Sequence, residues 1–144
     1  MKRAHTSIRR ATMADADSLK NLARSLATSF DFNEEAFNET FSRITDDENA
    51  RLIVSNDEGG AIDAYLLGFT HDSFFANGPV AWIEEMFVIE AMRRHGVGLA
   101  LEREFERWAK HQGAIMIALA TRRGAPFYCA IGFEESATYF RKLL

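Results

Sequence analysis

The sequence predicts an α/β (α+β) fold, organised as a single domain over residues 1–144. Segments with the 3.6-residue apolar period of helices alternate with short apolar segments typical of strands, in the order β-α-α-β-β-β-α-β-α-β. No internal repeat, low-complexity tract or linker interrupts this order. A chain of 144 residues is long enough to bury a core, so one domain is expected.

The first third of the chain predicts an edge strand and two helices. Residues 7–10 form the strand, and residues 12–30 form a helix that begins near Thr12 or Asp15. One face of this helix is apolar: Leu19, Leu22, Ala23 and Leu26. Residues 33–44 form the second helix, with Asn33 as its N-cap and an apolar stripe of Phe37, Phe41 and Ile44.

The remainder of the chain predicts five strands and two further helices. Residues 51–55 and 61–75 are strand-like and are separated by the turn signal NDEGG, and residues 79–89 form the next strand. From Val97 the apolar period becomes helical and ends at Gly113. Three elements follow: a continuous apolar run typical of a buried strand (114–121), a short helix (125–133) and a closing strand (136–144).

Composition excludes several classes of protein. The net charge of −4 argues against a general nucleic-acid binder, and no apolar run approaches the roughly 20 residues of a membrane span. The basic N-terminus MKRAHTSIRR lacks the apolar segment of a signal peptide, so the cytoplasm is expected. The single cysteine and four scattered histidines give no disulfide framework and no metal-ligand spacing.

The segment RRHGVG, residues 93–98, places cationic side chains and two glycines directly before a helix. Positive charge there opposes the helix dipole, unless an anion normally occupies the loop. Glycines allow close approach of a ligand, and the free N–H groups of the first helical turn point toward it. The loop therefore predicts a phosphate site, although a tight turn with solvated arginines is the alternative. It matches neither a P-loop nor the G-x-G-x-x-G fingerprint.

Two motifs at a suitable separation carry a family resemblance. The segment EEMFVIEAMRRHGVGLALEREFERWA contains R-x-x-G-x-G, and FYCAIGFEE contains F-Y-x-x-x-G-F. Together with the order of elements, these residues closely resemble the GNAT superfamily of acyl-CoA-dependent N-acetyltransferases. The resemblance implies a mixed, mostly antiparallel sheet flanked by about four helices. That sheet would be split between the strands around 82–88 and 114–121.

The resemblance implies acetyl-CoA as co-substrate and no metal. The loop would hold the pyrophosphate through its six residues Arg93, Arg94, His95, Gly96, Val97 and Gly98, and Leu99 would border the cofactor. The backbone of Met86, Phe87 and Val88 would pair with the pantetheine arm. Arg122 and Arg123 stand where many relatives carry an asparagine, so their role is left open.

For catalysis, the resemblance makes Tyr128 the general acid that protonates the leaving thiolate; packing on the core is the alternative. Glu84 is the preferred general base and Glu85 the second choice, because strand alternation sends their side chains to opposite faces. An ion pair or solvation of either glutamate, or removal of the proton by water, is left open. Cys129 is not expected to be a nucleophile, since a lone cysteine is usually a small buried hydrophobe.

The acceptor is expected to be a primary amine of a small molecule. Seven acids against Arg43 between residues 31 and 48 would favour a cationic amine, although a solvated acidic helix face is slightly preferred. Phe74 and Phe75 are expected at the rim of the acceptor pocket, in the core or at a dimer contact. A protein or peptide acceptor, a non-catalytic acyl-CoA sensor and a homodimer are left open; no nucleic-acid or membrane partner is expected.

Overall fold

The computed structural model describes residues 7–144 of the chain. The first six residues, which belong to the basic segment used above to argue against a signal peptide, lie outside this range. Within it, no helix has the length and apolar character needed to cross a membrane.

A five-stranded sheet with the order β1-β2-β3-β4-β5 forms the centre of the fold. Neighbouring strands run antiparallel except for β4 and β5, which are parallel. The strands are β1 (Ser7–Arg10), β2 (Ala50–Asn56), β3 (Ile62–His71), β4 (Val80–Val88) and β5 (Met116–Leu119). The expectation of a mixed, mostly antiparallel sheet is confirmed.

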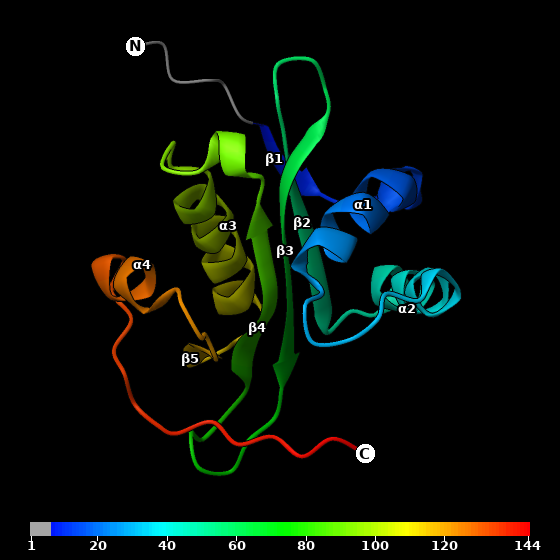
Figure 1. The fold of residues 1–144 in the computed structure, drawn as a ribbon. Coiled ribbons are helices and arrows are strands. Elements are labelled where there is room, and N and C mark those ends of the chain that lie inside the picture. The colour runs from blue at the N-terminus through cyan, green and yellow to red at the C-terminus, as the bar shows by residue number, and fades with distance from the viewer. Residues whose placement is uncertain (1–6) are drawn as a thin grey trace.

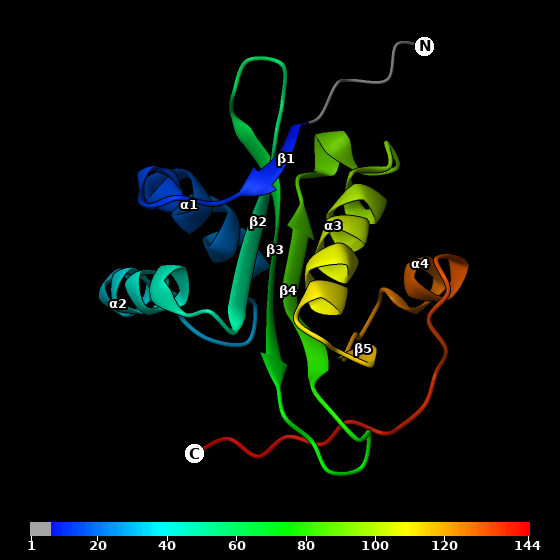
Figure 2. The same ribbon diagram turned by 180° about the vertical axis from the view of Figure 1, so that it is seen from behind.

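Helices cover both faces of the sheet, two on each side (Figures 1 and 2). On one face lie α1 (Ala16–Leu26) and α2 (Glu34–Asp46), and on the other α3 (Val97–His111) and α4 (Ala125–Ala130). Short 3-10 turns precede α1 (η1, Met13–Asp15) and follow β4 (η2, Glu90–Met92). The predicted number of helices is confirmed.

Each face of the sheet has its own apolar core. On the α3 side, fully buried Leu101 and Phe105 pack against Leu66 of β3 and its neighbours. On the α1 and α2 side, Leu19 and Phe41 pack on Val54 and adjacent residues of β2 and β3. These are the helix faces that the 3.6-residue period predicts, because period-matched apolar residues share one side of a helix.

Local residues determine where α2 begins and where α3 ends. The Asn33 side chain accepts a hydrogen bond from the Ala36 amide at 2.9 Å, as expected of an N-cap. Gly113 follows α3 with a φ of 82°, a left-handed conformation that glycine adopts without steric cost. Helix α1 ends at Leu26, earlier than the predicted end at residue 30.

Two predictions about the C-terminal part are wrong. Strand β5 is not buried: Met116 is exposed and the other three residues of the strand are half-buried, because among residues 7–144 no further strand pairs with its outer edge. Residues 136–144 are not a strand. A strand needs a neighbour for its backbone hydrogen bonds, whereas this tail runs past the end of the sheet instead of along β5 (Figure 1).

Gly68 of β3 allows α3 to sit closely on the sheet. A Cβ atom at this position would overlap the ring of Phe105 and lie 2.9 Å from the Trp82 carbonyl oxygen. We therefore expect Gly68→Ala to lower the free energy of unfolding by about 1–3 kcal/mol, the range typical of overpacking. Denaturant unfolding measures this change. Gly59→Ala is the control, since its Cβ meets only an ordinary contact at 3.4 Å; equal losses in both variants would contradict the packing argument.

Candidate active site

The central sheet opens between β4 and β5. The two strands pair from Val80 opposite Met116 to Ile83 opposite Leu119, and the pairing stops there. On its other side β4 remains paired with β3 as far as Val88. Within residues 7–144, the backbone of Met86, Phe87 and Val88 therefore has a free edge that faces the opening. An extended ligand can hydrogen-bond to such an edge.

The start of α3 lies next to this opening and leaves backbone donors free. The first hydrogen bond of the helix runs from the Ala100 amide to the Gly96 carbonyl at 3.0 Å. No side chain caps the helix, and among the described residues none accepts from the amides of Val97, Gly98 or Leu99. Three free donors at the positive end of a helix form a site that suits a phosphate.

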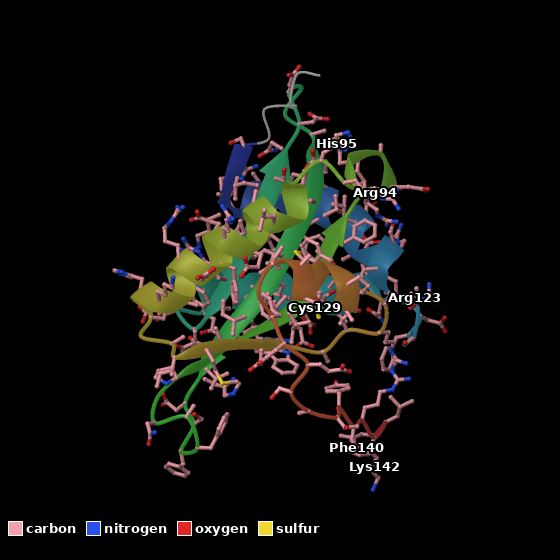
Figure 3. The ribbon with its side chains drawn as sticks, turned by 90° about the vertical axis from the view of Figure 1, so that its left-hand side faces the viewer. Arg94, His95, Arg123, Cys129, Phe140 and Lys142 are labelled. Carbon is pink, nitrogen blue, oxygen red and sulfur yellow. The ribbon has the colours of Figure 1, made fainter. Side chains whose placement is uncertain are left out.

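The loop before α3 holds an unusual backbone conformation. Gly96 has a φ of 83° and Arg94 a φ of 65°. The left-handed region costs a non-glycine residue about 1–2 kcal/mol, and such strain concentrates at ligand sites. The side chains of Arg94 and His95 lie exposed beside the free amides (Figure 3).

Arg93 connects this loop to β4. Its Nε donates to the Val88 carbonyl at 3.0 Å, and its guanidinium lies over the Phe87 ring. His95 Nδ1 lies 2.8 Å from the Arg93 carbonyl oxygen. Arg93 therefore braces the loop against the strand in addition to bringing positive charge to it.

A pocket of about 200 Å³ lies at the opening and brings together the predicted catalytic side chains. Glu84, Glu85 and Tyr128 all line it. The remaining walls come from the end of α1, from β4 and from the segment after β5: Leu26, Ile83, Met86, Leu119, Ala120, Thr121 and Arg122. Arg123 lies outside this lining, which separates two neighbouring arginines that the sequence could not distinguish.

The prediction that Glu84 and Glu85 point to opposite faces is wrong. Leu67 pairs with Glu85 and Gly68 with Ile83, so Glu84 is an extra residue in the strand. A bulge of this kind interrupts the alternation of side chains. Both carboxylates consequently reach the same pocket.

The two glutamates nevertheless differ in environment. Glu84 is exposed and accepts a hydrogen bond from Trp82 Nε1 at 2.9 Å. Glu85 is half-buried and accepts from the Tyr65 hydroxyl at 3.2 Å. Burial raises the pKa of the Glu85 carboxyl, while the bond from Tyr65 opposes that rise in part.

Tyr128 lies in α4, whose aromatic side chains hold it in place. Its ring makes edge contacts with Phe127 at 5.0 Å and Phe133 at 5.5 Å between centroids. Burial, and then the charge of Glu102 on α3, raise the pKa of Tyr128 to about 12. The phenol is therefore protonated at neutral pH and able to donate.

Other residues that the sequence singled out lie away from this pocket. Phe74 and Phe75 are exposed in the β3–β4 loop, neither in the core nor at the pocket. None of the seven acids between residues 31 and 48 lines the pocket, which favours a solvated helix face for them. Cys129 is exposed on the surface of α4, so the expectation of a buried thiol is wrong (Figure 3).

Sequence reasoning missed the residues that hold the glutamates. Tyr65 comes from β3 and meets Glu85 only through the strand register, which no local pattern reveals. Trp82 could have been found, because it stands two residues before Glu84 on the same strand. Among residues 7–144, no group of three or more His, Cys, Asp or Glu side chains is arranged to hold a metal ion.

Comparisons with known proteins identify a family and related sequences. The chain matches the Acetyltransferase (GNAT) family profile over residues 16–133. Aminoglycoside N(6')-acetyltransferase type 1 of Acinetobacter genomosp. 13 is 28% identical over 122 residues, covering 78% of this chain and 82% of the relative. The protein of the same name from Klebsiella aerogenes is 36% identical over 74 residues, covering 47% of this chain and 49% of the relative.

Solved structures share the fold. AAC(6')-Iy, in complex with the bisubstrate analog CoA-S-monomethyl-acetylneamine, superposes with a TM-score of 0.85 at 21% identity, over 98% of this chain and 100% of that one. Glucosamine-6-phosphate N-acetyltransferase from Arabidopsis thaliana gives 0.84 at 20% identity, over 96% and 97%. At these identities the likeness establishes the fold alone.

The raised pKa of Glu85 predicts a pH-dependent stability difference. A carboxyl whose folded pKa exceeds its unfolded value favours folding below the unfolded pKa, and this stability is lost as pH rises through the folded pKa. Glu85→Gln removes this loss, so its stability relative to wild type should increase as the pH rises above the unfolded pKa of a glutamate, about 4.3. Denaturant unfolding at pH values below and above this pKa measures the difference.

Tyr65→Phe is the matched variant for this test. It removes the hydrogen bond that favours the ionised carboxylate, so stability should be lost over a wider pH range than in wild type. A constant difference between Glu85→Gln and wild type at all pH values would contradict the assigned environment of Glu85.

Proposed function

Because the chain belongs to the Acetyltransferase (GNAT) family, we propose that it transfers an acetyl group from acetyl-CoA to a primary amine of a cationic small molecule. It is an acetyl-CoA-dependent acyltransferase, and the whole chain is proposed to act as one N-acetyltransferase domain. The observation that carries the proposal is the pocket that places Tyr128 with Glu84 and Glu85 beside the free edge of β4.

The residues around the opening suit the donor acetyl-CoA. The free amides of Val97, Gly98 and Leu99, with Arg94 and His95 at the rim, would bind its pyrophosphate. The backbone of Met86, Phe87 and Val88 would bind the pantetheine arm as an added strand does. This arrangement directs the thioester toward the pocket between β4 and β5.

The reaction needs one group that accepts a proton from the amine and another that donates a proton to the leaving thiolate. The acceptor amine is protonated at neutral pH, and a carboxylate of the pocket would attract it and take its proton. The neutral amine then attacks the thioester carbonyl, the carbon–sulfur bond breaks, and Tyr128 protonates the departing thiolate. The nitrogen loses its second proton as the amide forms, and solvent carries a proton back to the tyrosinate, so the products are the amide and CoA thiol. The acetyl group passes directly to nitrogen, so no cysteine is needed.

An aminoglycoside is the small-molecule class that we propose as acceptor. Support comes from the curated relatives, which are aminoglycoside N(6')-acetyltransferases. Exposed Glu84 and its partner Trp82 would present a carboxylate and an aromatic ring to a polycationic sugar. Tyr139 of the C-terminal tail stacks on Trp82 at 6.5 Å between centroids and extends this wall.

We further propose a cytoplasmic location, no nucleic-acid or membrane partner, and a homodimer. The dimer is supported by apolar side chains exposed at the start of β5, on the residue before it and on the tail: Met116, Ile115, Phe140 and Leu143. Burial of such residues between two copies would stabilise the pair. A monomeric mass in sedimentation equilibrium at micromolar concentration would contradict the dimer.

Release of CoA thiol tests the proposed function. Wild-type protein with acetyl-CoA and a panel of amines, including aminoglycosides, should release thiol at a rate that depends on the amine. Tyr128→Phe keeps the ring contacts and removes only the proton, so turnover at saturating acetyl-CoA should fall about 100-fold with CoA affinity unchanged. A sensor that only binds acyl-CoA would show no turnover with any amine, and full activity of the variant would remove Tyr128 from the mechanism.

Separate substitutions of the two glutamates identify the proton acceptor. We expect Glu84→Gln to lower turnover by about 10²–10⁴-fold, more than Glu85→Gln does, because Glu84 is exposed whereas Glu85 is half-buried, although each accepts one hydrogen bond from an aromatic side chain. CoA affinity should change little in either variant, and pH–rate profiles provide the comparison. The larger loss in Glu85→Gln would assign the base to Glu85, and full activity of both would favour a water relay.

A further inference from the structure

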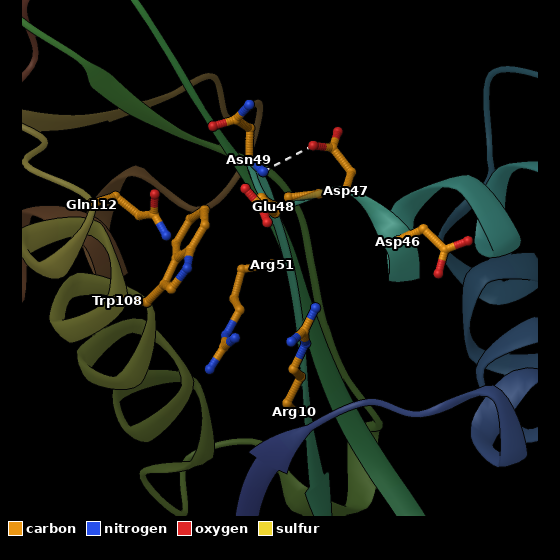
Figure 4. A pocket seen from close by; sticks show the side chains of 9 residues that line it. Arg10, Asp46, Asp47, Glu48, Asn49, Arg51, Trp108 and Gln112 are labelled. Atoms are coloured by element: carbon orange, nitrogen blue, oxygen red, sulfur yellow. Dashed lines mark hydrogen bonds between the residues drawn. The ribbon is translucent and has the colours of Figure 1, made fainter.

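A second pocket, of about 280 Å³, lies where β1 ends, β2 begins and α3 ends (Figure 4). Arg10 and Arg51 come from the two strands, Trp108 and Gln112 from the end of α3, and Asp47 from the loop after α2. It shares no lining residue with the pocket between β4 and β5. Nothing in the acetyl-transfer mechanism uses these side chains.

The side chains of Arg10 and Arg51 lie side by side and make few hydrogen bonds with the rest of the described chain (Figure 4). The Nε of Arg51 is buried and has no hydrogen-bond partner among the described residues. Arg10 makes one long bond, from Nη2 to the Thr45 carbonyl at 3.4 Å. A buried donor without an acceptor costs free energy that a bound acceptor would recover.

Charge adds to this cost. Burial, and then the charge of Arg10, lower the pKa of the Arg51 guanidinium, although arginine stays charged in proteins. Glu104 of α3 offsets the effect only in part, since its carboxylate is bound by Arg107 at 2.6 Å. The lining also carries the acids Asp46, Asp47 and Glu48, but none of them forms an ion pair with Arg10 or Arg51 within the described residues. An anion that binds between the two guanidiniums would supply such a partner.

Arg9, which precedes Arg10 on β1, makes the contacts expected of an arginine with a structural role. Its two terminal nitrogens each donate to Asp15 at 2.8 Å, and its Nε donates to Asn56 at 2.9 Å. The acids near Arg10 and Arg51 form no comparable bonds with these two arginines within the described residues. Glu48 is exposed and Asp47 accepts from the Asn49 amide at 2.8 Å, and neither forms an ion pair with an arginine in the part of the chain described.

We propose that this pocket binds a small molecule bearing one oxyanion group, a carboxylate or a phosphate, held by Arg10 and Arg51. Planar guanidiniums match both groups through paired hydrogen bonds, and Trp108 supplies an apolar wall. The site is separate from the acetyl-CoA site, so donor and anion would bind at the same time.

Tryptophan fluorescence can report on this pocket alone. The chain has two tryptophans, so Trp82→Phe leaves only Trp108, which lines the pocket. In this background, sodium phosphate and sodium acetate are titrated at constant ionic strength, with CoA saturating so that phosphate does not occupy the loop before α3. We expect a saturable change in emission with at least one of the two anions. A response to phosphate alone assigns a phosphate ligand, and a response to acetate alone assigns a carboxylate.

Substitution of the arginines supplies the decisive comparison. Arg51→Gln and Arg10→Gln should each weaken the binding about tenfold or more, because each removes a charged donor. Arg103→Gln, on the exposed side of α3, makes the same change of net charge and should leave the binding unaltered. If Arg51→Gln does not fold, Arg10→Gln decides the question. The absence of a saturable response to either anion, or equal responses in all variants, would overturn the proposal.

Discussion

Strand β5 pairs with β4 only as far as Ile83, and from Glu84 onward no strand of the described chain pairs with β4 on that side. The interruption coincides with the bulge in β4, where Glu84 has no partner residue on β3. A bulge increases the local twist and redirects side chains. The same irregularity therefore opens the sheet and frees backbone groups for an extended ligand. It also directs two adjacent carboxylates into the same pocket.

The loop before α3 is the second part of this arrangement, and it depends on the first. Arg93 reaches the Val88 carbonyl because the free edge of β4 leaves that carbonyl accessible. The bond ties the loop that contains Arg94, a residue in the left-handed conformation, to β4 beside the first turn of α3. Helix α3 is itself fixed on the sheet through Phe105, which occupies the space that Gly68 leaves empty. Core packing on one face thus positions an anion site at the end of the same helix.

Local signals in the sequence predicted most of the elements and the donor side of the site. Asn33, Gly113 and the glycine loop act within their own short segments, Asn33 through its side chain and the glycines through their backbone, so a single segment carries the information. The acceptor side depends on contacts between distant segments. The bond between Tyr65 and Glu85 requires the register of β3 against β4, and the bulge that aligns the glutamates has no sequence signal of its own. The C-terminal residues have the composition of a strand, yet they run past the end of the sheet instead of pairing with the outer edge of β5.

The central claim is that the free amides of α3 and the free edge of β4 form one continuous binding surface for CoA. Backbone amide chemical shifts in a ¹H–¹⁵N spectrum, followed during a titration with CoA, test it most directly. The account predicts the largest changes at Val97, Gly98 and Leu99, together with changes at Met86 and Val88, and little change at Arg10 and Arg51. Binding of CoA that leaves the amides of both segments unperturbed would contradict it.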